Sequence, residues 1–138
     1  MKALTLLLLR LSTGIYLILW GLIKLQAKDM AVGVSDKYYG GVLSSDLLNY
    51  GVGVVEVVVG LLVVLGLMRS IAYAGQVVFY FIGAAAIIAN LIDPFGLFLA
   101  AGPKLTFFPS WTLLFASLII IAFKEYDTYS IDAKRQAQ

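Results

Sequence analysis

Between Leu47 and Leu67 the chain runs for 21 residues with a single charged side chain, Glu56. A stretch of this length and apolarity can cross the ~30 Å hydrocarbon core of a bilayer as one helix. It is rich in valine and glycine, which in a short segment would suit a buried strand, but its length favours a membrane helix. The stretch therefore predicts a membrane-spanning helix.

Three further apolar stretches have the same character. They predict four spans in all, at about residues 4–25, 47–67, 71–92 and 106–123. The third span should end at Asp93, because a proline follows it and disfavours helix in the residue before. Residues 94–108 are apolar but interrupted by glycine and proline, so this stretch either lies along the membrane surface or dips back into the bilayer.

The composition agrees with an integral membrane protein. Hydrophobic residues make up 62% of the chain and charged residues 13%, and the mean hydropathy is +0.96. A water-soluble domain could not bury so much apolar surface. We therefore expect an all-α fold, a four-helix bundle in the membrane formed by one domain of 138 residues.

The same composition excludes several classes of function. The chain has no cysteine and no histidine, which removes thiol chemistry, disulfides and the usual ligands of zinc and haem. We expect no metal site, and no cofactor other than a bound quinone. The net charge of +2 comes from scattered residues without a basic run, so nucleic acid is not an expected partner.

The basic residues predict the orientation of the chain. Six would lie on the side of the termini and four on the other side: Lys2, Arg10, Arg69, Lys124, Lys134 and Arg135 against Lys24, Lys28, Lys37 and Lys104. Loops rich in Lys and Arg stay in the cytoplasm. We expect both termini there, residues 124–138 as a cytoplasmic tail, and a multi-pass protein of the cytoplasmic (inner) membrane.

Small and polar residues recur along the spans at alternating spacings of four and three. The first two spans show Arg10, Gly14, Leu17, Gly21, Lys24 and Asn49, Gly53, Glu56, Gly60, Val63. Membrane helices associate through close backbone approach at small residues and through hydrogen bonds between helices. A 3.5-residue repeat predicts left-handed packing of the bundle along these stripes.

The charges within the spans require partners, because a charge near the centre of a membrane helix costs on the order of 3 kcal/mol. We expect Arg10 to pair with Glu56 in a buried polar cluster, with Gln76, Tyr80 and Ser117 adding hydrogen bonds. The pair would either fix helix register or form a polar site for a proton or a ligand head group. A protonated, neutral Glu56 is the alternative.

A second cluster should form at the outer end, where five polar and aromatic residues reach similar depth: Trp20, Lys24, Asn49, Asn90 and Asp93. Such residues often act as interfacial anchors. The alternative is a pocket for the head group of a quinone or a lipid. No catalytic residue can be assigned.

Four segments together resemble the DoxX family: Leu7–Leu11, Trp20–Leu25, Gly53–Leu62 and Leu65–Arg69. That family pattern has an arginine early in its first helix and a glycine and lysine at its end. A glutamate and glycine follow in a second helix, which closes on a Gly-Leu-x-x-Arg turn. Arg10, Lys24 and Glu56 occupy the matching polar positions.

The resemblance implies a four-helix membrane protein related to small subunits of quinone-linked oxidoreductases. Our leading hypothesis is an accessory subunit of a membrane redox complex that binds quinone or lipid and docks a partner subunit, since the chain lacks cofactor ligands. One alternative is a stand-alone quinone-linked oxidoreductase that uses Glu56 or Tyr80 as proton donor. Another is a purely structural subunit of a larger membrane complex.

Overall fold

The computed structural model describes residues 1–138, which form helices and turns without any strand. The all-α prediction is confirmed. The helices are α1 (Lys2–Gln26), α2 (Lys28–Tyr38), α3 (Asp46–Leu65), α4 (Arg69–Ala86), α5 (Ile88–Ile92), α6 (Pro109–Ala122) and α7 (Ile131–Gln136). Short 3₁₀ turns lie at Val42–Ser44, Leu105–Phe107 and Lys124–Tyr126.

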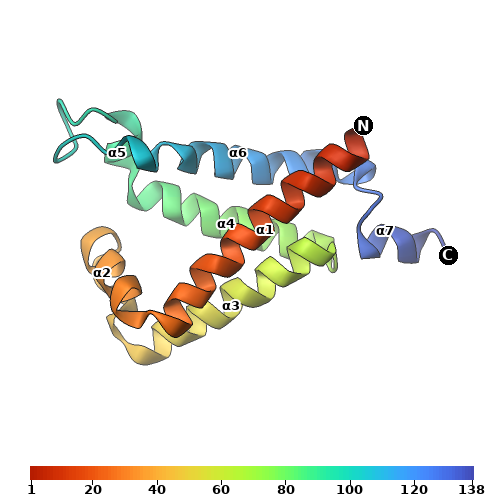
Figure 1. The fold of residues 1–138 in the computed structure, drawn as a ribbon, viewed down its shortest axis with the longest axis horizontal. Helices are drawn as coiled ribbons and strands as arrows, with labels where there is room; N and C mark the ends of the chain where they lie inside the picture. Colours follow the sequence, from red (N-terminus) through yellow and green to blue (C-terminus); the bar gives the residue numbers. More distant parts are fainter.

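The long helices pack mainly as two pairs. Helix α1 runs beside α3, and α4 runs beside α6, as Figure 1 shows. Both termini lie at one end of the molecule, while α2 and the loop that follows α5 lie at the opposite end.

Three segments are long and apolar enough to cross a membrane: α1, α3 and Leu105–Ala122, which contains α6. Helix α4 has the necessary 18 residues, but it is not among the three, because polar residues occupy much of one face. Those polar residues are buried within the molecule: Arg69, Tyr73, Gln76 and Tyr80. The left-handed packing of the four long helices stays a prediction.

Glycines bring the backbones of α1 and α3 into direct contact. A Cβ atom on Gly21 would lie 2.7 Å from the backbone oxygen of Gly53, and one on Gly60 would lie 2.9 Å from that of Gly14. Every residue of the two predicted stripes on these helices is buried. The interpretation of these stripes as the packing seam is confirmed for α1 and α3.

The predicted bounds of the later spans differ from the structure. Helix α4 ends at Ala86, where the Ile87 N–H bonds to Ala84 in a tightened turn, and α5 follows as a separate helix. Helix α6 begins at Pro109, a favoured first position because proline has no N–H to leave unpaired. Residues 105–107 precede it as a 3₁₀ turn.

The turn between α3 and α4 depends on Gly66. Its φ of +68° is left-handed, and the N–H groups of Gly66 and Leu67 bond back to Val63 and Leu62 as a C-terminal cap. A Cβ atom here would lie 2.3 Å from that of Ser130, so the position has no room for a side chain. Residues 124–138, predicted as a tail, instead pack against this turn.

Candidate functional site

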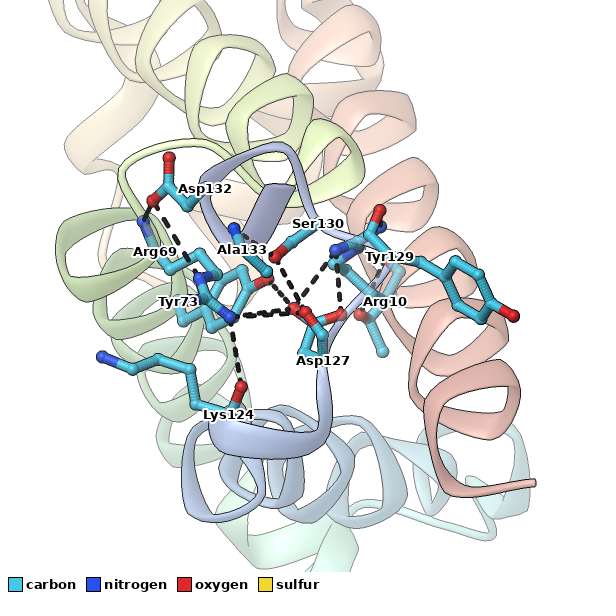
Figure 2. Close-up of polar contacts among 10 residues, drawn as sticks. Arg10, Arg69, Tyr73, Lys124, Asp127, Tyr129, Ser130, Asp132 and Ala133 are labelled. Carbon is cyan, nitrogen blue, oxygen red and sulfur yellow. Dashed lines mark hydrogen bonds and ion pairs between the residues drawn. The ribbon is translucent and has the colours of Figure 1, made fainter. Parts of the chain in front are cut away.

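Asp127 is the centre of a buried polar cluster at the end of the molecule that holds both termini (Figure 2). Its carboxylate accepts two hydrogen bonds from Arg10 Nη1, at 2.9 and 3.1 Å, and one from the Tyr73 hydroxyl. Arg10 is 2% exposed and Asp127 is 1% exposed. A carboxylate shared in this way joins α1, α4 and the C-terminal segment.

Arg69, at the start of α4, completes this terminal cluster. Its guanidinium donates to the backbone oxygens of Lys124 and Asp127, at 3.1 and 3.4 Å, and lies 3.9 Å from the Asp127 carboxylate. Its backbone N–H donates to Asp132 at 2.9 Å, and Asp132 donates its own N–H to Gly66. The C-terminal segment is therefore bonded to both ends of the α3–α4 turn. Figure 2 shows the contact between Asp132 and Arg69.

The predicted ion pair between Arg10 and Glu56 is wrong. Arg10 pairs with Asp127, whereas Glu56 pairs with Lys24, whose Nζ lies 2.7 Å from Glu56 Oε2. The prediction placed Lys24 in the outer cluster and Glu56 in the other one. The structure joins them in a single pair at the contact between α1 and α3.

The Lys24–Glu56 pair is buried but not saturated. Both residues are less than a tenth exposed, and the ammonium group, with three donors, makes one hydrogen bond within the chain. Asn49 lies beside the pair, donating its amide to the Lys24 backbone oxygen at 2.7 Å. Its own amide oxygen is buried and has no partner.

Aromatic rings surround this pair. The Lys24 ammonium lies 5.6 Å from the ring centre of Trp20, and Tyr16 meets Trp20 edge to face. Tyr39, from the connection after α2, places its hydroxyl 3.6 Å from where a Cβ atom on Gly83 of α4 would lie. Burial, and then the nearby Glu56 carboxylate, raise the pKa of Tyr39, so it stays a hydrogen-bond donor at neutral pH.

The remaining residues of the predicted buried cluster do not meet the ion pairs. The Tyr80 hydroxyl donates to the backbone oxygen of Thr13, and Ser117 donates to Leu114 within its own helix. The Gln76 side chain is 1% exposed, yet neither its nitrogen nor its oxygen has a partner. These residues line the middle of the bundle between the two charged clusters.

Two residues of the predicted outer pocket, Asn90 and Asp93, form no hydrogen bond or ion pair with the Lys24–Glu56 pair. Asn90 is half-buried in α5, and its side chain makes no hydrogen bond within the chain. The Asp93 carboxylate accepts N–H groups of the loop that follows it. Donors from Leu99, Phe98 and Leu97 lower the pKa of Asp93 well below its ordinary range. That carboxylate is committed to its own loop and does not complete the pocket.

Asp127 and Tyr39 were not among the site residues predicted from the sequence. Asp127 was missed because it follows the last apolar stretch and was assigned to a tail. An arginine near one end of a span needs an anion at the same depth, and this requirement could have directed attention to the acidic residues just after Phe123. No signal in the sequence marked Tyr39.

Two surface hollows of the molecule are lined by residues that belong to neither charged cluster. One, of about 410 Å³, is a shallow depression on α6 lined by Phe108, Trp111, Thr112 and Phe115. Its lining carries no charge. The concentration of ionisable and aromatic groups at Lys24 and Glu56 therefore makes that site, rather than the hollow, the candidate for chemistry.

Comparisons with known proteins give one family match that includes α1 and α3. No curated protein and no solved structure matches the chain. The family model of DoxX matches residues 5–90, a range that contains Arg10, Lys24, Glu56 and both packing stripes of the α1–α3 pair. Because this match covers more than half of the chain, the protein belongs to the DoxX family.

Proposed function

We propose that this DoxX family membrane protein binds a quinone at the Lys24–Glu56 pair and serves as an accessory subunit of a membrane redox complex. The observation that carries the proposal is the unused hydrogen-bonding capacity of a charged pair within the membrane-spanning part. A pair that served packing alone would gain from full saturation, because each unmet polar group in an apolar setting costs free energy.

The chemistry around the pair suits a quinone head group. Quinone carbonyl oxygens accept hydrogen bonds, and the Lys24 ammonium and the Tyr39 hydroxyl are donors. Trp20 offers a ring face beside the ammonium, against which a planar head group can stack. Glu56 can exchange a proton when the quinone is reduced or the quinol oxidised.

The chain lacks the side chains that usually hold redox cofactors, so electrons would reach the quinone from a partner subunit. We place the protein in the cytoplasmic membrane with four crossings. Helix α4 would be the fourth, since its polar face is buried against α3, α6 and the C-terminal segment. Both termini would lie in the cytoplasm, which puts the Lys24–Glu56 pair in the outer half of the membrane.

Quinone binding is tested by the fluorescence of Trp20 in a Trp111→Phe background, with a short-tailed quinone titrated into protein in lipid nanodiscs. Binding should saturate. Lys24→Met should weaken it by about tenfold or more, because a hydrogen bond to a charged group contributes about 1.5–3 kcal/mol.

The matched control is Lys28→Met. Lys28 follows Lys24 by four residues, and its ion pair with Asp46 is more exposed than the Lys24–Glu56 pair. The quinone affinity of the Lys28→Met variant should equal that of the Trp111→Phe parent. Quenching that never saturates, or equal affinities for all three proteins, would contradict quinone binding at this pair.

The accessory role is tested by purification from native membranes. A copurified redox partner should reduce quinone, and the rate should fall when this chain is removed and return when it is added back. The chain alone should be inert. Turnover by the isolated chain would instead establish a stand-alone oxidoreductase, whereas partner activity independent of this chain would leave a purely structural subunit.

A further inference from the structure

The loop between α5 and the turn before α6 lies at the end of the molecule opposite the termini (Figure 1). It exposes large apolar side chains. Residues 94–103 include no polar side chain. The exposed fractions are 66% for Phe95, 71% for Leu97, 88% for Phe98 and 66% for Leu99. Soluble surfaces rarely expose such a contiguous apolar patch, so these side chains need an apolar environment.

The backbone of this loop is organised by the preceding aspartate. One Asp93 oxygen accepts the Leu97 N–H at 3.0 Å, and the other accepts those of Phe98 and Leu99 at 2.7 and 2.8 Å. The Ala100 N–H also points to the second oxygen, at 3.3 Å. The Gly96 N–H bonds to the Asp93 backbone oxygen. The N–H groups of residues 96–100 therefore all bond to Asp93 and do not need water as a partner.

We propose that residues 94–103 insert their side chains into the boundary between the lipid head groups and acyl chains of the leaflet at that end of the bundle. An irregular segment can leave water only if its N–H groups are satisfied internally, because each unsatisfied group costs several kcal/mol in hydrocarbon. Asp93 meets this requirement for consecutive residues at the tip. The loop is not helical, so it stays at the boundary and does not enter the core of the bilayer.

Neighbouring residues are those expected at a lipid boundary. Lys104 closes the loop through its N–H bond to the Pro94 oxygen, and its long side chain can reach lipid phosphates. Trp111 stacks on Phe115 at 5.7 Å between ring centres, in the first half of α6. Aromatic residues gather at membrane interfaces in this way. The occupant is therefore lipid, not a protein groove.

The absence of cysteine permits a direct test with a spin label on single-cysteine variants in lipid vesicles. Phe98→Cys reports on the loop tip, Gln136→Cys on an aqueous position, and Val58→Cys on an exposed residue in the middle of α3. Collisions of the label with oxygen, which concentrates in lipid, are compared with those of a water-soluble nickel chelate.

The label at Phe98→Cys should collide with oxygen several-fold more, and with nickel several-fold less, than the label at Gln136→Cys. Its values should lie between those of the two reference positions. Nickel access equal to that at Gln136→Cys would overturn the proposal. Protection from both agents would also overturn it, since a protein partner or a second copy would then cover the loop.

The role of Asp93 is tested in the same labelled protein. Asp93→Ala removes both acceptor oxygens and should shift the tip label toward the nickel-accessible, aqueous values, and Asp93→Asn should shift it less. The Val58→Cys label should be unchanged in both backgrounds, which shows that the bundle is intact. A tip label that stays at the same depth in Asp93→Ala would contradict the role of the carboxylate.

Discussion

Arg10 and Glu56 lie on facing stripes and yet take different partners, because of helix register and side-chain direction. Gly14 faces Gly60 and Gly21 faces Gly53, so Glu56 is level with residue 18 of α1. Arg10 is eight residues from that level, about 12 Å along the axis, whereas Lys24 is six residues away, about 9 Å.

The Cα–Cβ bond of a helical residue tilts toward the N-terminus of its helix. Lys24 and Glu56 therefore lean toward each other, and Arg10 leans away.

The pairing of Arg10 with Asp127 predicts a specific pattern of stabilities. Asp127→Leu alone should lower the free energy of unfolding by about 3–5 kcal/mol, because it leaves a buried guanidinium without its anion. Arg10→Leu should also destabilise. The double variant should recover part of the combined loss. The measurement is reversible unfolding in mixed detergent micelles, followed by circular dichroism.

Glu125→Gln is the matched control for this cycle, since Glu125 lies two residues from Asp127 but is exposed; it should change stability little. Combining Arg10→Leu with Glu56→Leu should give additive losses, as expected for residues without contact. Additive losses for Arg10 with Asp127, or strong coupling of Arg10 with Glu56, would contradict the assigned pairs.

At the scale of helices, the α1–α3 contact differs from the α4–α6 contact in its chemistry. The first is a crossing of backbones at glycines, with a charged pair toward the end that holds α2. In the second, Leu114 packs with Tyr80 and Ala84 in one apolar core cluster. The close backbone approach holds Lys24 and Glu56 within hydrogen-bond distance. The candidate site therefore depends on small residues at this crossing.

Substitutions at two glycines of α3 distinguish the effect of helix packing on stability from the effect of helix propensity. A Cβ atom on Gly60 would lie 2.6 Å from Ile18 and 2.9 Å from the Gly14 oxygen, whereas one on Gly51 would meet nothing within 4 Å. Gly60→Ala should destabilise the protein by about 1–3 kcal/mol through overpacking. Gly51→Ala should be neutral or stabilise it by up to about 1 kcal/mol, since alanine favours helix.

Unfolding in mixed micelles measures both variants. Gly60→Ala should also weaken quinone binding, because it pushes apart the helices that carry Lys24 and Glu56, while Gly51→Ala should not. Equal stability of the two variants would show that the backbones of α1 and α3 are farther apart at Gly60 than in the structure.

At the scale of the whole molecule, the C-terminal segment closes the bundle. It contacts the N-terminal half of α1 through Asp127 and the α3–α4 turn through Asp132. The two charged clusters then lie toward opposite ends, one at the termini and one near α2. If the bundle spans the membrane four times, they belong to opposite halves of the bilayer.

The positions of the termini and of the connections between helices predict the membrane topology. Reporters fused after Gln138 and inserted at Gly40 should lie on opposite sides, with Gln138 in the cytoplasm, because more Lys and Arg lie at that end. A reporter in the α3–α4 turn, at Met68, should match Gln138. Alkaline phosphatase and fluorescent-protein fusions measure this. Finding Gln138 and Gly40 on one side would contradict four crossings.

The helical fold, three of the apolar spans and the faces on which α1 and α3 meet could be predicted from local patterns in the sequence. These features are local: span length reflects bilayer thickness, and the periodic placement of small residues follows from the pitch of one helix. The sequence also indicates which polar residues need partners, since a charge in a span is costly wherever it lies.

The partners of these polar residues could not be predicted in the same way, because they are set by contacts between distant parts of the chain. Ion pairing depends on the register between two helices, on the direction of each side chain and on where the chain returns after its last span. A shift of one helical turn between two helices changes the partner of a charged residue, and the local sequence does not indicate that register. Asp127 reaches Arg10 across 117 residues of sequence, and Asp93 turns to its own loop because four N–H groups there converge on one carboxylate.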